Sequence, residues 1–213
     1  MCRDEARDYF RCGTCGLVFV PPTQFVSPEA EKTRYDLHQN SPQDAEYRKF
    51  LNRLLAPMCE RLAPGSRGLD FGSGPAPTLS LMFQERGHSM AIYDPFYARD
   101  SSVLEHKYDF ITLTEVVEHL HEPGKELDRL WSILKPGGLL GIMTRMPSED
   151  CRMANGTESA SRINVESFVR WHYRNDLTHI CFYSQSAFEW LAARWHAELT
   201  FADKDVILLS KKL

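Results

Sequence analysis

A short apolar strand runs directly into a glycine-rich turn near residue 70, and this feature restricts the fold more than any other in the chain. Gly68–Phe71 is the expected strand, and Gly72-Ser73-Gly74 is the turn. Glycine permits positive φ angles and a close approach of the backbone to a ligand. A helix is expected over residues 78–86, and its N-terminus offers free N–H groups and a partial positive charge. The pattern predicts a ligand-binding α/β unit.

The next expected strand, residues 89–93, ends in an acidic residue. Asp94 follows that strand and lies twenty positions after Gly74. A carboxylate at this place can accept hydrogen bonds from both hydroxyls of a ribose. The glycine turn and Asp94 together indicate a cofactor that contains a nucleoside.

Strands and helices continue to alternate after this unit. Strands are expected at 109–114 and 139–144, with a weak one at Val103-Leu104. Hydrophobic spacing predicts helices over about 45–62, 122–134 and 185–195. This order is typical of an open, mainly parallel α/β sheet. Residues 146–184 are expected to be irregular.

The C-terminal strands differ from the others. Residues 197–201 and 206–209 are separated only by Ala202–Asp205. A parallel crossover needs a dozen or more residues, so these two strands are predicted to pair as an antiparallel hairpin. The mainly parallel sheet is therefore expected to end in an antiparallel strand.

The choice among nucleoside cofactors depends on two residues. The third glycine of a dinucleotide fingerprint is replaced by Pro77, and Asp70 places negative charge where a pyrophosphate would lie. An anion is disfavoured beside another anion, whereas the ammonium and sulfonium of S-adenosylmethionine are attracted to it. A dinucleotide and a glycine turn without any ligand remain alternatives.

Composition excludes several classes of partner. The 213 residues include 25 basic and 29 acidic side chains, for a net charge of −4. This balance lacks the broad basic footprint of a nucleic-acid-binding protein. No apolar stretch is long enough to span a membrane, and the charged N-terminus lacks the apolar core of a signal peptide. We expect a cytoplasmic protein with a small-molecule substrate.

Residues 66–145 resemble the class I S-adenosylmethionine-dependent methyltransferases. Leu69–Gly74 resembles their first motif, and Tyr93-Asp94-Pro95 resembles their second. Tyr108–Leu120 is similar to their fourth strand and the turn after it, and Leu134–Gly138 to the entry of their fifth strand. The resemblance implies a Rossmann-like, seven-stranded sheet whose last strand is antiparallel.

The same resemblance implies which residues bind the cofactor. The first motif would line its methionine portion, the second would bind the ribose and pack on the adenine, and the fourth strand would end near the sulfonium. The residues are Asp70, Gly72 and Gly74 in the first motif, Asp94, Pro95 and Phe96 in the second, and Thr114 and Glu115 after the fourth strand.

The two ends of the chain resemble a bacterial subgroup that begins with a zinc-ribbon-like segment. The string Arg34–Asn40 and the segment Trp171–Ser184 carry this likeness. We divide the chain accordingly into a partial zinc-ribbon-like cysteine segment at 1–22, a helical lid region at 23–62, and the methyltransferase domain at 63–213.

Cys12-Gly13-Thr14-Cys15 has the spacing of a zinc knuckle. A closed structural zinc site needs four ligands, and the subgroup supplies a second pair upstream. This sequence offers only Cys2 there. Three alternatives stay open: zinc held by Cys2, Cys12 and Cys15 with a borrowed residue such as His38, a site lost with a truncated N-terminus, and a knuckle that folds without metal. A redox disulfide between Cys12 and Cys15 is a weaker alternative.

Histidines are the expected acid–base groups, because the histidine pKa lies near neutrality. His119 follows the turn after the fourth strand, His38 lies in the N-terminal string, and His172 and His179 follow the fifth strand. We predict catalytic roles for His119, His38 and His179, while a purely structural role competes for each.

The sequence therefore predicts methyl transfer to a small molecule, with oxygen or carbon as the acceptor atom. Two alternatives remain. In one, the acceptor is a macromolecule that docks through the cysteine knuckle. In the other, the chain is a catalytically silent module that binds S-adenosylmethionine.

Overall fold

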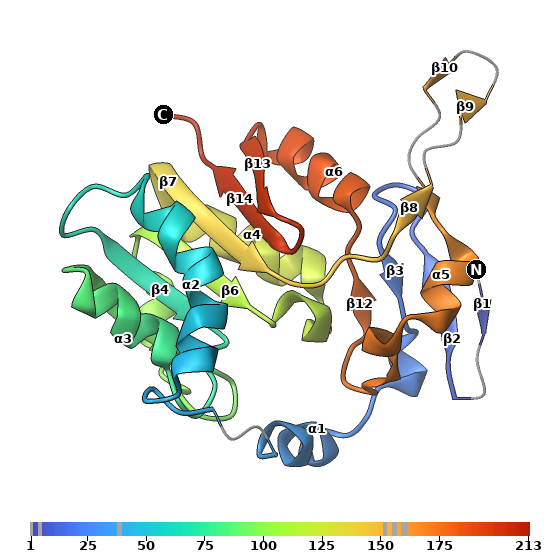
Figure 1. Ribbon diagram of the computed structural model, residues 1–213, viewed down its shortest axis with the longest axis horizontal. Helices are drawn as coiled ribbons and strands as arrows, with labels where there is room; N and C mark the ends of the chain where they lie inside the picture. The colour runs from blue at the N-terminus through green and yellow to red at the C-terminus, as the bar shows by residue number, and fades with distance from the viewer. Residues whose placement is uncertain (1, 4–5, 38–39, 151–152, 155–156, 159–161) are drawn as a thin grey trace.

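The computed structural model describes residues 2–3, 6–37, 40–150, 153–154, 157–158 and 162–213 (Figure 1). Its centre is a six-stranded sheet in the order β13-β14-β7-β6-β4-β5. The strands are β4 (Arg67–Phe71), β5 (Ser89–Tyr93), β6 (Tyr108–Thr114), β7 (Leu134–Met143), β13 (Glu198–Asp203) and β14 (Val206–Ser210). The pairs β4–β5, β4–β6 and β6–β7 are parallel, whereas β14 is antiparallel to both β7 and β13.

The helices of the described ranges are α1 (Pro28–Tyr35), α2 (Ala45–Cys59), α3 (Thr78–Glu85), α4 (Pro123–Ile133), α5 (Val165–Arg170) and α6 (Gln185–Trp195). α2 and α3 cover one face of the main sheet, and α4 and α6 cover the other. α1 and α5 lie apart from the main sheet (Figure 1). The 3₁₀ turns are η1 (Pro22–Gln24), η2 (Ser101–Glu105), η3 (Val117–His119) and η4 (His172–Asn175). Within the described ranges, no helix is long and apolar enough to cross a membrane.

Two hydrophobic clusters hold these layers together. On one face, Leu51, Leu54 and Met58 of α2 pack with Phe83 of α3 against the sheet. On the other face, α4 and α6 bury their apolar residues, and Leu130 of α4 is fully buried. A sheet covered on both faces requires apolar strands, and β6 and β14 meet this requirement. The predicted fold class and the C-terminal hairpin are confirmed.

The predicted seventh strand is wrong. Val103-Leu104 lies in η2, so the main sheet of the described chain has six strands. Asp100 caps this turn through a 3.0 Å hydrogen bond from the Ser102 N–H. The Tyr108 hydroxyl donates to the Val103 carbonyl at 2.7 Å. Both bonds engage backbone groups that a strand would need for pairing.

A second sheet joins the N-terminal strands to a short strand near residue 181. Its order is β1 (Cys2–Arg3), β2 (Asp8–Arg11), β3 (Val18–Phe19) and β12 (Cys181–Phe182). Cys181 pairs with Phe19 in an antiparallel register. The ring of Tyr9 packs edge-on against the rings of Phe168 and Phe182. Figure 1 shows the N-terminal strands beside β12 and α5.

Residues 146–184, expected to be irregular, contain short strands and helices. Besides α5, η4 and β12, it includes β8 (Glu149–Asp150), β9 (Met153–Ala154), β10 (Thr157–Glu158) and β11 (Arg162–Ile163). β8 pairs with β11, and β9 pairs with β10. The β9–β10 pair projects away from the two sheets in Figure 1.

Candidate functional site

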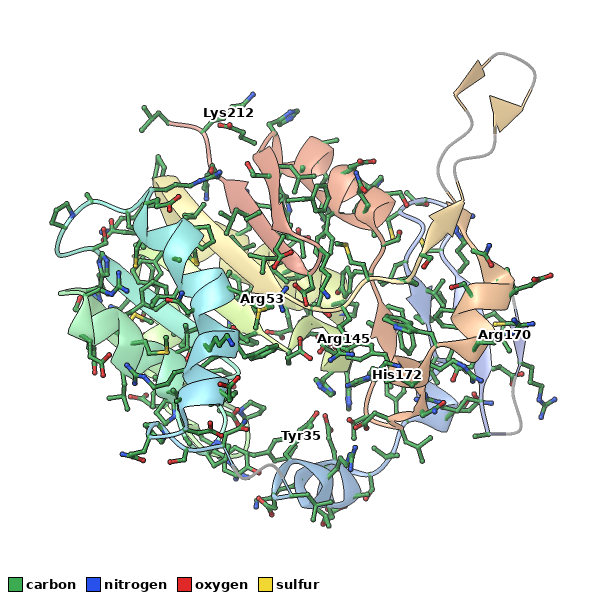
Figure 2. The ribbon with its side chains drawn as sticks, in the orientation of Figure 1. Tyr35, Arg53, Arg145, Arg170, His172 and Lys212 are labelled. Carbon is green, nitrogen blue, oxygen red and sulfur yellow. The ribbon has the colours of Figure 1, made fainter. Side chains whose placement is uncertain are left out.

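The carboxyl ends of β4, β5 and β6 open into one cavity of about 750 Å³. This is the edge at which open α/β sheets bind ligands. Side chains from the N-terminal region cover it: Tyr35 comes from α1, and Tyr47 and Phe50 come from α2. Figure 2 shows Tyr35 extending from α1 toward the sheet. All predicted cofactor residues except Asp70 line this cavity.

The glycine turn has the backbone conformation that its sequence predicts. Gly72 has a φ of 77° and Gly74 a φ of 63°. A Cβ atom on Gly72 would lie 2.4 Å from Cγ2 of Val116, whereas one on Gly74 would meet nothing within 4 Å. A glycine is therefore required at position 72 because of the positive φ and because a Cβ atom would clash with Val116. At position 74 only the positive φ requires it.

Asp94 ties the glycine turn to the loop after β5. One carboxylate oxygen accepts a 2.9 Å hydrogen bond from the Gly74 N–H. The other accepts from the N–H groups of Phe96 and Tyr97, at 2.8 and 3.0 Å. An ionised carboxylate has about four acceptor sites, so it can still accept from a bound hydroxyl. Asp94 therefore fixes the cavity wall and keeps an acceptor position for a bound hydroxyl.

Asp70 does not line the cavity, contrary to its predicted contact with the methionine portion. Its carboxylate is buried and accepts hydrogen bonds from Thr112 at 2.8 Å and Ser80 at 3.1 Å. Asp70 and Thr112 are register partners on β4 and β6. Burial is the main cause that raises the pKa of Asp70 to about 6. The residue joins β4, β6 and α3 below the site.

Two hydroxyl groups in the cavity wall have no hydrogen-bond partner among the described residues. Across the described chain, Ser73 Oγ and Thr114 Oγ1 are among the few buried side-chain atoms without a hydrogen bond. Both residues line the cavity. Buried polar groups are normally satisfied. These two hydroxyls therefore suit a polar ligand such as the amino acid portion of S-adenosylmethionine.

Two glutamates and a tyrosine lie next to this wall. The Tyr173 hydroxyl donates to a Glu118 carboxylate oxygen and lies 3.3 Å from Glu115 Oε2. Thr144 donates to the second Glu118 oxygen at 3.0 Å. Burial, together with the charge of Glu118, raises the pKa of Glu115 to about 8. Burial also raises the pKa of the fully buried Glu118.

Glu115 has an unusual backbone. Its φ of 53° lies in the left-handed region, which non-glycine residues rarely adopt. Its N–H donates to the Met143 carbonyl at 2.8 Å. Strained conformations of this kind concentrate at functional sites. The left-handed conformation of Glu115 turns the chain at the end of β6, where Glu115 and Val116 line the cavity.

His119 and His179 meet beside the glutamates. Their ring centroids are 4.8 Å apart, with one ring edge-on to the other. His119 Nδ1 lies 3.0 Å from the Thr178 carbonyl, and His179 Nδ1 lies 2.6 Å from the Tyr173 carbonyl. Burial and the neighbouring His119 lower the pKa of His179. Two of the three histidines predicted to be catalytic therefore share one site.

The other two histidines of the sequence analysis are not in this pair. His38 lies outside the described residues. His172 is exposed, and its Nε2 lies 3.1 Å from Arg145 Nη1. Figure 2 shows His172 and Arg145 side by side.

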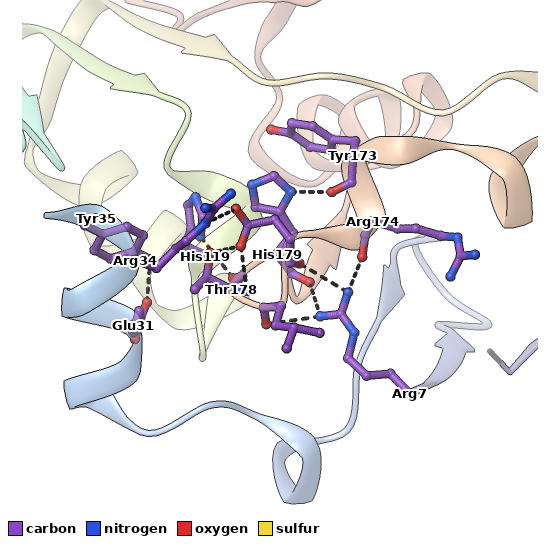
Figure 3. Close-up of polar contacts among 11 residues, drawn as sticks. Arg7, Glu31, Arg34, Tyr35, His119, Tyr173, Arg174, Thr178 and His179 are labelled. Atoms are coloured by element: carbon purple, nitrogen blue, oxygen red, sulfur yellow. Dashed lines mark hydrogen bonds and ion pairs between the residues drawn. The ribbon is translucent and has the colours of Figure 1, made fainter. Parts of the chain in front are cut away.

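Arg7 holds the segment that carries His179. Its buried guanidinium donates to the carbonyl groups of Leu177 at 3.1 Å, His179 at 2.9 Å and Asp176 at 3.2 Å, and to that of Arg174 (Figure 3). The N-terminal strands thereby fix one wall of the cavity. Sequence analysis missed this residue because its partners are backbone atoms about 170 positions away.

Helix α1 is linked to both sides of the cavity. The Arg34 Nε donates to Asp176 at 2.8 Å, and Tyr97 donates to Asp36 at 2.6 Å. The Tyr35 hydroxyl donates to Glu31 at 2.5 Å, and its ring packs edge-on against His119. These contacts fit the lid region predicted at 23–62.

The cysteine segment does not fit a closed zinc site. Cys12 and Cys15 form the turn between β2 and β3, and hydrogen bonds from the turn backbone lower the pKa of Cys12. In the described part of the chain, Cys2, Cys12 and Cys15 do not bring three ligand atoms within 4.8 Å of one another. Zinc at this segment stays a prediction, and we derive no function from it.

No role for Glu118 was predicted from the sequence, although it is visible there as the second acid of Glu-x-x-Glu-His, three positions after Glu115. Tyr173, in an aromatic loop, is expected from the sequence to cover the cofactor or the substrate, and nothing local indicates that its hydroxyl binds Glu118.

A profile of a methyltransferase domain family matches residues 39–199, more than half of the chain. The chain belongs to this methyltransferase family. This confirms the predicted enzyme class, a methyltransferase. A search among curated proteins finds no match. The bacterial subgroup stays a prediction.

Solved structures agree with this methyltransferase fold. A 1,6-didemethyltoxoflavin N1-methyltransferase of Burkholderia thailandensis, bound to 1,6-didemethyltoxoflavin and S-adenosylhomocysteine, superposes with a TM-score of 0.50 at 14% identity. The match covers 92% of this chain and 96% of that one. A protein of Methanococcus maripaludis, provisionally assigned as an S-adenosylmethionine-dependent methyltransferase, gives a TM-score of 0.51 at 13% identity, covering 87% and 93%. At these identities the likeness concerns the fold alone.

Proposed function

We propose that this methyltransferase transfers the methyl group of S-adenosylmethionine to an oxygen or carbon atom of a small molecule. The observation that carries the proposal is that the predicted cofactor residues other than Asp70 and the Glu115–His119–His179 group line the same cavity. Its volume of about 750 Å³ lies in the range of small-molecule sites. When bound, S-adenosylmethionine supplies a methyl group on an electrophilic sulfonium.

The chain's own residues would divide this work. Gly72, Ser73 and Thr114 would hold the amino acid portion of the cofactor, and Asp94 the ribose hydroxyls. Pro95 and Phe96 would pack on the adenine. Glu115 and the two histidines would face the acceptor, with Tyr35 above them. α1 would act as the lid, because it contacts Asp176 on one side and Tyr97 on the other.

The acceptor atom is inferred from the titratable groups. A hydroxyl or an acidic carbon must lose a proton to become a good nucleophile, whereas a neutral amine already has a lone pair. A carboxylate and two histidines around the cavity suit the first requirement. We therefore favour oxygen or carbon over nitrogen.

Calorimetry on the purified chain tests the cofactor assignment. S-adenosylhomocysteine and S-adenosylmethionine should bind with micromolar dissociation constants, about −8 kcal/mol, and NADH should not bind. Asp94→Ala should weaken this binding by about tenfold or more. Asp100→Ala is the matched control, because Asp100 also caps a turn but lies outside the cavity. Equal affinity of Asp94→Ala and wild type would overturn the ribose assignment.

An acceptor screen tests the reaction. Phenols, enolisable ketones and primary amines are offered in parallel, and acceptor-dependent formation of S-adenosylhomocysteine is measured. Turnover of a phenol or a ketone is expected. Turnover of amines alone would overturn the choice of acceptor atom.

A further inference from the structure

Glu118, His119 and His179 bring three ligand atoms within 4.8 Å of one another, and they are the one such group in the described part of the chain. Two imidazoles and a carboxylate are typical ligands of divalent transition metals. A cation about 2.0–2.2 Å from each ligand would hold them roughly 3–4 Å apart. The separations between the three ligand atoms therefore exceed those of a bound metal site by about an ångström at most.

The hydrogen bonds of the two histidines support this use. Nδ1 of His119 lies at the Thr178 carbonyl and Nδ1 of His179 at the Tyr173 carbonyl, at 3.0 and 2.6 Å (Figure 3). A proton on Nδ1 puts the lone pair of each ring on Nε2. Metal-binding histidines almost always donate their other nitrogen in this way.

The carboxylate is oriented as well. Both Glu118 oxygens accept hydrogen bonds from hydroxyl groups, one from Tyr173 and one from Thr144. Each oxygen has a second lone pair that can reach a cation. Glu115 lies on the other side of the Tyr173 hydroxyl, so two carboxylates meet at one phenol. A divalent cation would stabilise the ionised form of both carboxyl groups.

We propose that Glu118, His119 and His179 bind one divalent transition-metal ion at the wall of the methyl-acceptor cavity. His119 and His179 line that cavity and Glu118 lies behind them. Three protein ligands leave coordination positions open toward the cavity, as in catalytic metal sites. Glu115 lines the cavity beside them and is not needed as a ligand.

The metal would select the acceptor, and this part rests on the proposed function. An oxygen atom of the substrate can occupy an open position on the cation. A bound hydroxyl would then lose its proton more readily to the carboxylate of Glu115, which lines the cavity beside the ligands, because the cation stabilises the anion. The resulting oxygen or carbon nucleophile would take the methyl group, and the sulfonium would leave as the neutral thioether. The substrate class is therefore a molecule whose reacting hydroxyl, or the carbonyl next to its reacting carbon, coordinates the metal.

Cobalt binding tests the site without any substrate. The full chain is treated with a chelator and titrated with Co²⁺ near neutral pH, and the visible absorption of the bound ion is recorded. One Co²⁺ per chain is expected, with the absorption of nitrogen and oxygen ligands. His179→Ala and Glu118→Gln should each weaken binding by about tenfold or more, and Zn²⁺ should displace the cobalt.

Two controls separate this site from others. His172→Ala removes an exposed histidine of the same segment and should leave the titration unchanged. Cys12→Ser/Cys15→Ser removes the competing thiol pair and should also leave it unchanged. Loss of cobalt binding in the cysteine variant with retention in His179→Ala would overturn the proposal, as would the absence of cobalt binding in wild type.

A parallel measurement keeps the two proposals apart. The affinity for S-adenosylhomocysteine is determined for wild type, His179→Ala and Glu118→Gln, with unfolding midpoints to confirm that the variants fold. Cofactor binding without cobalt binding would overturn the metal site alone. Cobalt binding without cofactor binding would overturn the proposed function and leave the metal site standing.

Discussion

The guanidinium of Arg7 donates a 2.9 Å hydrogen bond to the backbone carbonyl of His179, although 172 positions separate the two residues. It binds three further carbonyl groups of the same segment. The segment that carries His179 is thus held by Arg7, just before β2, and also by η3 after β6, where the Glu118 carbonyl accepts a 2.8 Å hydrogen bond from the Ile180 N–H. Arg7 positions the backbone of this segment and does not line the cavity itself.

Arg7→Met should impair catalysis and stability but spare the cofactor. Four carbonyl groups would lose a charged donor, so we expect the free energy of unfolding to fall by about 2–4 kcal/mol. The turnover number should fall by about tenfold or more as His179 shifts. Affinity for S-adenosylhomocysteine should change little. Urea denaturation, turnover and calorimetry check the three effects.

Arg170→Met provides the matched control, since Arg170 is an exposed arginine of the same part of the chain. It should behave like wild type in all three measurements. A normal turnover number in folded Arg7→Met would show that Arg7 does not position the site.

Asp70 should make the protein less stable as the pH rises from about 4 to 6. Its pKa is 3.8 as a free carboxyl group and about 6 in the fold, so the folded state binds the proton more tightly. A raised pKa stabilises the fold at low pH, and that stability is lost as the pH rises through the window. The expected loss is about 3 kcal/mol. Asp70→Asn should not show it, and urea denaturation across this pH range compares the two.

Asp109 gives a control of opposite sign. It pairs with Lys135 at 2.8 Å, and its pKa is lowered in the fold although burial alone would raise it. Its stabilising effect is present at neutral pH and is lost as the pH falls. Asp109→Asn should therefore flatten the acid side of the profile. A pH profile of Asp70→Asn identical to wild type would contradict the assignment to Asp70 of the stability loss between about pH 4 and 6.

Gly72→Ala should damage the cofactor cavity more than Gly74→Ala. Both changes place a side chain at positive φ, which costs about 1 kcal/mol. Only the Gly72 variant adds a Cβ atom 2.4 Å from Val116. We expect it to weaken S-adenosylhomocysteine binding by about tenfold or more, because the turn must shift away from its ligand. Calorimetry on both variants measures the difference.

A double variant isolates the steric effect. Val116→Ala removes the methyl groups that the new side chain would strike, so Gly72→Ala/Val116→Ala should recover part of the lost affinity. If the two single effects simply add, the clash is not the cause.

Arg53 should stabilise the C-terminal hairpin. Its guanidinium, on α2, pairs with Asp203 at 2.7 Å and also with Asp205, which is buried (Figure 2). Removal of the arginine would leave the Asp205 carboxylate buried without its cation. Arg53→Met should lower the free energy of unfolding by about 3 kcal/mol. Arg61→Met, which loses one exposed 3.3 Å hydrogen bond to Thr200, should lower it by about 0.5 kcal/mol or less.

The sequence was sufficient to predict the elements whose information is local. The strand before Gly72 and the C-terminal hairpin each depend on neighbouring residues, and both are confirmed in the fold. The hairpin connection is shorter than predicted, because β13 extends to Asp203 and leaves only Lys204 and Asp205 before β14. Asp70 was misplaced because side chains alternate along a strand. Asp70 lies two positions before the turn, and its carboxylate binds Ser80 and Thr112 rather than lining the cavity. Phe71, the next residue, does line the cavity.

The site was less predictable because its contacts are distant in the sequence. His119 and His179 are 60 positions apart, and nothing local indicates that they meet. Their contact depends on Arg7 and on the pairing of Phe19 with Cys181. Neither relation has a sequence signature, since one uses backbone carbonyls and the other uses a two-residue strand.

The pairing of β3 with β12 also sets the order in which the protein can mature on the ribosome. Residues 18–19 leave the exit tunnel long before residues 181–182 have been synthesised. At about 5–20 residues per second, the first strands wait on the order of ten seconds or more for their partner. The main sheet has its parallel strands available earlier. The residues that line the cavity from the segment around His179 therefore reach their places only when that segment closes onto the first twenty residues, after the strands that carry the glycine turn and Asp94 have been synthesised.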